Sequence, residues 1–174
     1  MSLIVEDGSG LSTAESYASV AEADAYHLVH GNPSVWNALS TGEKEQNLRM
    51  ATDYIDGKFA TDFKGYRTYS AQALRWPRSG VADLDGYIFP ANGTGSVPVR
   101  LKNATAILAL RVASDTTLFL DQSNGSVSSE SVTVGAVSFS TSYSGAATGQ
   151  KVYTEVEAML VDLLGSSNGV MERA

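Results

Sequence analysis

Apolar side chains recur with the spacing of an α-helix in four stretches of this chain. In the first two stretches, a Ser followed three residues later by a Glu forms a capping box, which marks a helix start. In the third, Pro98 suits the first helical turn, and apolar residues surround almost the whole circumference, which predicts the most buried helix. The pattern predicts a mainly α fold, a small bundle of about four helices near residues 19–30, 40–59, 98–112 and 152–164.

The first predicted helix has one apolar face. It begins at Ser19 and ends before Gly31, because Gly, Asn and Pro follow one another there. We expect the apolar face to pack on the core. Its members are Ala21, Ala25, Leu28 and Val29.

Residues 62–97 separate the second and third predicted helices, and no helical period persists in them. A loop of this length inside a compact domain is uncommon, and it is usually functional or locally ordered. Trp76 and Pro77 lie near its centre, between Arg75 and Arg78. We expect Trp76 and Pro77 to anchor a long ordered loop on the helices.

Residues 122–150 are rich in Ser, Gly and β-branched side chains. Apolar and polar residues alternate on both sides of Gly135-Ala136, which predicts a β-hairpin or an extended arm before the last helix. Because two strands are only marginally stable alone, we expect the arm to cover another surface. Its apolar residues, which we predict at an interface between copies of the chain, are Val132, Val134, Val137 and Phe139.

A chain of 174 residues suits a single domain. We expect it to consist of a helical core (1–121) that includes the loop 62–97, the arm (122–150), and a C-terminal helix with its tail (151–174).

Charge is distributed unevenly along the chain, whose net charge is −7. Residues 1–43 contain six acidic residues and no Lys or Arg, whereas residues 64–111 contain seven Lys or Arg and two Asp. The two segments either pack together within one monomer or join neighbouring copies head to tail in a ring. For the second alternative, the predicted interface residues are Glu6, Asp7, Glu22, Asp24, Arg67, Arg75 and Arg78.

Several kinds of chemistry find no support in the sequence. The absence of Cys excludes disulfides and thiolate chemistry. His27 and His30 have no third metal ligand at a suitable spacing, and Asp83-Leu84-Asp85-Gly86 lacks the remaining positions of a calcium loop, so we predict a turn there. We expect no metal, no cofactor, no catalytic site and, because no stretch of about 18 apolar residues occurs, no membrane span.

One basic and aromatic cluster leaves a nucleic-acid alternative open. Aromatic side chains that stack on single-stranded bases contribute ~1 to 3 kcal/mol per base. Two arguments oppose this alternative. The net charge is acidic, whereas nucleic-acid binders are usually basic, and a Trp that is flanked by Arg and followed by Pro more often fixes a loop on the core. The residues of this alternative contact are Tyr66, Tyr69, Arg75, Trp76 and Arg78.

Several runs of the sequence resemble a family of tailed-bacteriophage proteins, the small head-tail connector, adaptor or head-completion proteins. Some relatives in that family carry the label DnaT-like single-stranded DNA-binding protein. The most specific run is Gln72-Ala73-Leu74-Arg75-Trp76-Pro77-Arg78-Ser79-Gly80-Val81. Further similarity lies at 4–8, 16–26, 51–56, 97–98, 104–110 and 134–137, so that the resemblance covers almost the whole chain.

The resemblance implies a structural virion protein rather than an enzyme. Such an adaptor forms a ring, commonly twelvefold, docks on the portal protein, and offers its other face to the next neck or tail-completion protein. It would reside in the virion neck and in the host cytoplasm during assembly, and DNA would pass through the ring without specific binding. The alternative function is single-stranded DNA binding of the primosomal type.

Overall fold

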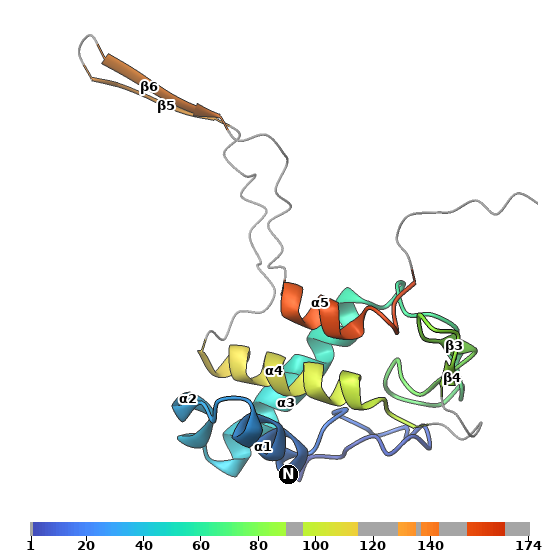
Figure 1. Ribbon diagram of the computed structural model, residues 1–174. Helices are drawn as coiled ribbons and strands as arrows, with labels where there is room; N and C mark the ends of the chain where they lie inside the picture. Colours follow the sequence, from blue (N-terminus) through green and yellow to red (C-terminus); the bar gives the residue numbers. More distant parts are fainter. Residues whose placement is uncertain (1, 90–95, 115–128, 135–136, 143–152, 166–174) are drawn as a thin grey trace, which may run out of the picture. The chain divides into compact units, whose positions relative to one another are not determined.

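Helices provide most of the regular structure in the computed structural model, which describes residues 2–89, 96–114, 129–134, 137–142 and 153–165 (Figure 1). This described part contains five helices, so the fold is mainly α. The helices are α1 (Val20–Val29), α2 (Ser34–Asn37), α3 (Thr41–Lys58), α4 (Val99–Ser114) and α5 (Thr154–Leu160).

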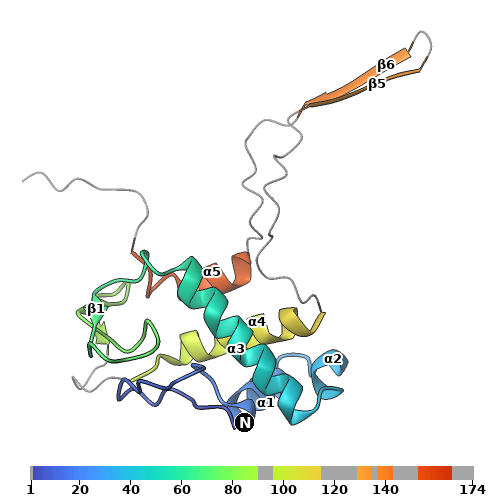
Figure 2. The same ribbon diagram turned by 180° about the vertical axis from the view of Figure 1, so that it is seen from behind.

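Helix α4 is the centre of the helical unit, because it contacts each of the other four helices. Helix α3 crosses behind α4 in Figure 1 and in front of it in Figure 2. The prediction that α4 is the most buried helix is confirmed. Its buried positions are Leu101, Ala104, Thr105, Ala106, Ile107, Leu108, Ala109 and Val112.

The starts of α1 and α3 follow the sequence prediction. In α1, the Ser19 hydroxyl accepts from the Glu22 backbone N–H at 3.2 Å, and the Glu22 carboxylate accepts from the Ser19 N–H at 2.8 Å. Ser40 and Glu43 form the same reciprocal pair at the start of α3. Each box satisfies two backbone donors that a helix start otherwise leaves unpaired.

The predicted core face of α1 is wrong. Leu28 and Val29 are 65 % and 74 % exposed, and Ala21 and Ala25 are exposed as well. The buried residues of α1 are Ala23 and His27. His27 Nε2 hydrogen-bonds to the main-chain carbonyl of Ala106 on α4 at 3.1 Å, which satisfies a polar ring inside the core.

The segment between α3 and α4 is locally ordered by two short antiparallel pairs. Strand β1 (Tyr66–Arg67) pairs with β2 (Arg78–Ser79), and β3 (Val81–Ala82) pairs with β4 (Ile88–Phe89). Gly65 precedes β1 with φ +65, and a Cβ there would lie 2.2 Å from the Ser79 carbonyl oxygen. Only glycine allows this close approach of the two chains.

The chain divides into two compact units, Met1–Thr116 with Tyr153–Ala174 and Thr117–Val152. The second unit contains the predicted hairpin, β5 (Ser129–Val134) and β6 (Val137–Ser142). Its register pairs Val132 with Phe139 and Val134 with Val137. The side chains of these four predicted interface residues lie outside the described part of the structure.

None of the helices in the described ranges has the length and apolar character needed to cross a membrane.

Candidate interaction surface

Trp76 attaches the segment between α3 and α4 to the interior. Its side chain is fully buried, and its indole Nε1 donates to the Ser96 carbonyl at 2.6 Å. The ring packs edge-on against Phe63, with centroids 6.2 Å apart. Because it is buried, Trp76 is not available to stack on a nucleic-acid base, and this part of the nucleic-acid alternative is corrected.

Arg78 is also buried, and its guanidinium organises the main chain around it. It donates to the carbonyl oxygens of Lys64 at 2.6 Å, Gly65 at 2.7 Å, Phe63 at 3.2 Å and Arg75 at 3.3 Å. Burial, together with the nearby charge of Arg75, lowers the pKa of Arg78. Arg78 therefore serves the fold and cannot meet a neighbouring copy or a phosphate, contrary to both predictions for it.

A buried hydrogen-bond network ties the same segment to α3. The Tyr17 hydroxyl donates to one oxygen of the Asp56 carboxylate and accepts from the Trp76 N–H at 3.1 Å. The other oxygen of Asp56 accepts from the Arg75 N–H at 2.9 Å. Burial raises the pKa of both Tyr17 and Asp56, while the hydrogen bonds hold the two groups in place.

Glu6 is fully buried, although the charge pattern predicts it at an interface. Its carboxylate accepts from the backbone N–H groups of Gly8 at 2.8 Å, Gly10 at 2.9 Å and Leu11 at 3.0 Å. Three main-chain donors compensate the cost of burying the charge. Glu6 consequently has no role at a surface.

Glu22 and Asp24 have cationic partners within the same chain. Glu22 lies 2.6 Å from Lys102 Nζ, and Asp24 lies 2.8 Å from Lys44 Nζ and accepts from Trp36 Nε1 at 2.7 Å. The Glu22–Lys102 pair joins the acidic N-terminal segment to the basic one within a monomer. For Glu22, the intramolecular alternative accounts for the charge pattern, whereas Asp24 pairs with Lys44, which lies outside both segments.

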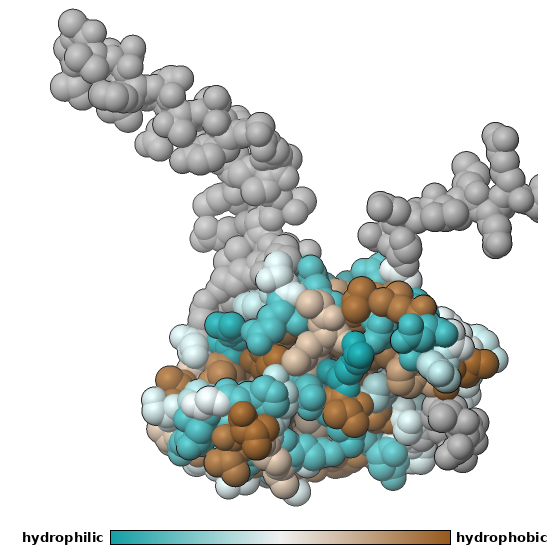
Figure 3. All heavy atoms as spheres, in the orientation of Figure 1, coloured by the Kyte–Doolittle hydropathy of each residue, from teal (hydrophilic) through white to brown (hydrophobic). Residues whose placement is uncertain are grey.

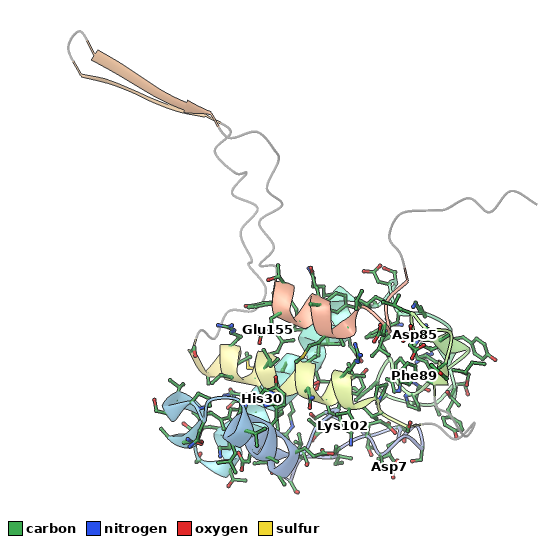
Figure 4. The ribbon with its side chains drawn as sticks, viewed as in Figure 1. Asp7, His30, Asp85, Phe89, Lys102 and Glu155 are labelled. Atoms are coloured by element: carbon green, nitrogen blue, oxygen red, sulfur yellow. The ribbon has the colours of Figure 1, made fainter. Side chains whose placement is uncertain are left out.

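Three of the predicted charged residues remain exposed: Asp7, Arg67 and Arg75. Asp7 (Figure 4) accepts from the Ser9 N–H at 2.8 Å, and hydrogen bonding to the Ser9 side chain and main chain lowers its pKa. Among the described residues, no carboxylate lies within ion-pair distance of Arg67 or Arg75. The two guanidiniums are available to an anionic partner.

Exposed tyrosines accompany these two guanidiniums in the same segment. Tyr66 is 68 % exposed, and Tyr69 is exposed at one edge while its ring lies against Gly10, where a Cβ would come within 2.3 Å of it. Tyr87, which the sequence did not single out, is 73 % exposed. Of the predicted nucleic-acid contact, Tyr66, Tyr69 and Arg75 therefore remain exposed, and the same segment adds the exposed Arg67 and Tyr87.

The predicted turn at 83–86 is confirmed. One carboxylate oxygen of Asp83 accepts from the backbone N–H groups of Asp85 at 3.0 Å and Tyr87 at 2.8 Å. The turn presents Leu84 and Ile88 to solvent beside Tyr87, an exposure that sequence reasoning missed. An Asp-x-Asp-Gly run signals a turn, but it carries no information on which way the apolar side chains of that turn face.

A groove of about 370 Å³ lies between α1, α4 and α5. Its residues include Tyr26, His30, Ile107, Leu110, Arg111 and Glu155. His30 Nδ1 is hydrogen-bonded to the Tyr26 carbonyl at 2.8 Å, and its ring stacks on the Tyr26 ring. Within the described ranges, no group of three or more His, Asp or Glu side chains is placed to hold a metal ion.

The fold and this surface define a mainly helical protein with a separate β-hairpin unit and an exposed surface of tyrosine and arginine. The family model described as "Putative DnaT-like ssDNA binding protein" matches residues 1–174. The chain belongs to this family. Neither the curated proteins nor the solved structures contain a match to it.

Proposed function

We propose that this protein is a structural head-tail adaptor of a tailed bacteriophage. In this proposal, copies of the chain associate into a ring, twelvefold in the virion, that docks on the portal and offers its other face to the next neck or tail protein. DNA passes through the ring without specific binding.

The observation that carries the proposal is the β5–β6 hairpin. Its two strands form a two-stranded sheet, and each strand pairs only with the other in the described part of the chain. Such a hairpin is marginally stable alone, and each strand has an outer edge that can pair with a further chain. An arm of this kind gains its stabilisation by lying on, or adding a strand to, a neighbouring molecule.

Two further features support the proposal. The long resemblance to head-tail connector proteins includes Val134 and Val137, the residues that close the hairpin. The net charge of −7 suits a conduit, because a negatively charged wall lets a polyanion pass without binding it.

The test is assembly on portal particles. We expect the full chain to bind them as a ring and Val132→Asp, at an apolar position of the alternating pattern, to abolish ring formation. Thr133→Asp, at the neighbouring polar position of the same strand, is the matched control and should assemble. Failure of the wild-type chain to bind portal particles, or equal assembly of both variants, would contradict the proposal.

Single-stranded DNA binding is the second candidate, favoured by the family description and by the exposed Tyr66, Tyr69 and Tyr87 in the segment that also holds the exposed Arg67 and Arg75. A salt titration with an oligonucleotide separates the two functions. For a single-stranded DNA binder, the logarithm of the binding constant falls linearly with the logarithm of the salt concentration, with a slope of about −0.7 for each phosphate contacted. If Arg67 contacts one phosphate, Arg67→Ala should make this slope shallower by about 0.7. The adaptor proposal expects no measurable affinity near physiological ionic strength.

A further inference from the structure

The turn between β3 and β4, residues 83–88, forms a stiff apolar projection that we name the β3–β4 tip. Leu84, Tyr87 and Ile88 are 71 %, 73 % and 65 % exposed. The Asp83 N–H donates to the Tyr87 carbonyl at 2.9 Å, and the Gly86 N–H donates to the Asp83 carbonyl at 3.2 Å, in addition to the two bonds that the Asp83 carboxylate accepts. A backbone fixed in this way loses little further entropy on binding, and three adjacent large apolar side chains favour a protein partner.

The groove between α1, α4 and α5 has the complementary character. Leu110 of α4 supplies apolar surface beside the buried Ile107, and rings come from Tyr26 of α1 and from His30 at the C-terminal cap of α1. The groove volume of about 370 Å³ is large enough to receive one or two side chains.

The tip and the groove lie at opposite ends of the helical unit. The groove is built on the C-terminal half of α4, through Ile107, Leu110 and Arg111. Figure 4 shows Asp85 and Phe89 at one end of this unit and His30 and Glu155 toward the other. Because the fold holds the tip and the groove apart at these two ends, a chain cannot place its own tip in its own groove.

Charge favours the same pairing. Asp85 is exposed, and among the described residues no cation lies within ion-pair distance of it. Arg111 stands at the groove with its side chain 56 % exposed, and its one carboxylate contact in the described part is a 3.3 Å pair with the equally exposed Glu155. An aspartate arriving with the tip would share this guanidinium.

We propose that the β3–β4 tip of one copy inserts into the α1–α4–α5 groove of a second copy. Leu84 and Tyr87 cover Leu110 and the Tyr26 ring, and Asp85 lies beside Arg111. Two unlike surfaces on each copy make a head-to-tail contact, which closes into a ring when the rotation allows. The inference rests on the proposed function, because it supplies the contact between neighbouring subunits of the adaptor ring.

The absence of Cys from the chain makes cross-linking a clean test. Leu84→Cys and His30→Cys are prepared as separate full-length variants, mixed in equal amounts under conditions of assembly, and treated with a short bis-maleimide. We expect the mixed 84–30 dimer as the main product. Gln46→Cys, exposed on α3 outside the groove, replaces His30→Cys in the matched control and should give little product.

A charge exchange tests the same contact without cross-linking. Asp85→Arg and Arg111→Asp should each weaken self-association by about tenfold, and the double variant should restore it to within about threefold of wild type. A prominent 84–84 product, mixed product no greater than the control, or no rescue by the double variant would overturn the tip-in-groove contact. Portal binding by the wild-type chain is measured in the same preparation. Portal binding without the 84–30 product rejects this inference alone, whereas the 84–30 product without portal binding rejects the adaptor proposal alone. A chain that remains monomeric in every mixture rejects both.

Discussion

Helix α1 and the segment between α3 and α4 differ in an instructive way. Helix α1 has a regular apolar period and a complete capping box, yet its apolar face is exposed, and Figure 3 shows hydrophobic surface over α1. The other segment has no period, and it holds the fully buried Trp76 and the buried Arg78. Periodicity identifies the residues that form a helix, whereas burial follows from which groups find partners in the interior.

The largest expected effect contrasts Trp76 with Leu28. Trp76→Ala removes a fully buried ring and its hydrogen bond to Ser96, and we expect a loss of about 3 to 5 kcal/mol in the free energy of unfolding. Leu28→Ala, on the exposed face of α1, should change it by less than about 0.5 kcal/mol. Urea unfolding of both variants measures this, and equal losses would remove the contrast between the two regions.

Arg78 and Arg75 allow the same contrast between two residues of one type in one segment. Arg78→Ala leaves four main-chain carbonyls without their donor, so we expect a loss of about 2 to 4 kcal/mol. Arg75→Ala retains the backbone N–H that bonds to Asp56 and removes an exposed side chain, with an expected change below about 0.5 kcal/mol. If denaturant midpoints move equally for the two variants, Arg78 does not organise the segment as described.

Glu6 and Asp7 are adjacent acids with opposite environments. Glu6→Ala removes the acceptor of three backbone N–H groups, and we expect it to destabilise the fold by about 1 to 3 kcal/mol. Asp7→Ala, at an exposed position, should cost clearly less. Thermal unfolding of the two variants in one buffer tests this order, and a reversed order would contradict the buried role of Glu6.

The smallest expected effect concerns His27, the buried polar residue of α1. Burial lowers its pKa from the usual 6.5, so the unfolded chain binds a proton there more readily than the folded chain. Stability should therefore fall as the pH drops below about 6.5, by at most about 1.4 kcal/mol per pH unit, until the pH passes the lowered pKa. His27→Gln should flatten this limb of the stability profile, and an unchanged slope would refute the assignment to His27.

The sequence predicts the helices best where hydrogen bonds between residues close in sequence determine the helix ends. Both capping boxes are local, because Ser19 with Glu22 and Ser40 with Glu43 complete each other within one turn. The hairpin follows from alternation on both sides of Gly135. Helix α2 was missed because its four residues carry no side-chain cap and are too few to display a period.

The candidate site was predicted less well, because charge in a sequence does not specify the partner. Arg78 binds carbonyls that precede it by 13 to 15 residues, and Glu6 binds amides that follow it. The exposure of Tyr87 depends on how the β3–β4 pair is oriented on the fold, which no local pattern encodes. Arg67, Arg75 and Tyr66 lie at the surface, as a contact with a neighbouring copy or with nucleic acid would require, and the contact itself stays a prediction.

The central claim is that the protein works by binding copies of itself and a larger ring. The most direct test is the mass of the chain at physiological ionic strength, measured alone and after mixing with portal particles. The account predicts that the portal particles gain several chain masses together, up to a complete ring, and that an added oligonucleotide changes nothing. A single chain mass that ignores the portal particles and rises when single-stranded DNA is added would contradict it.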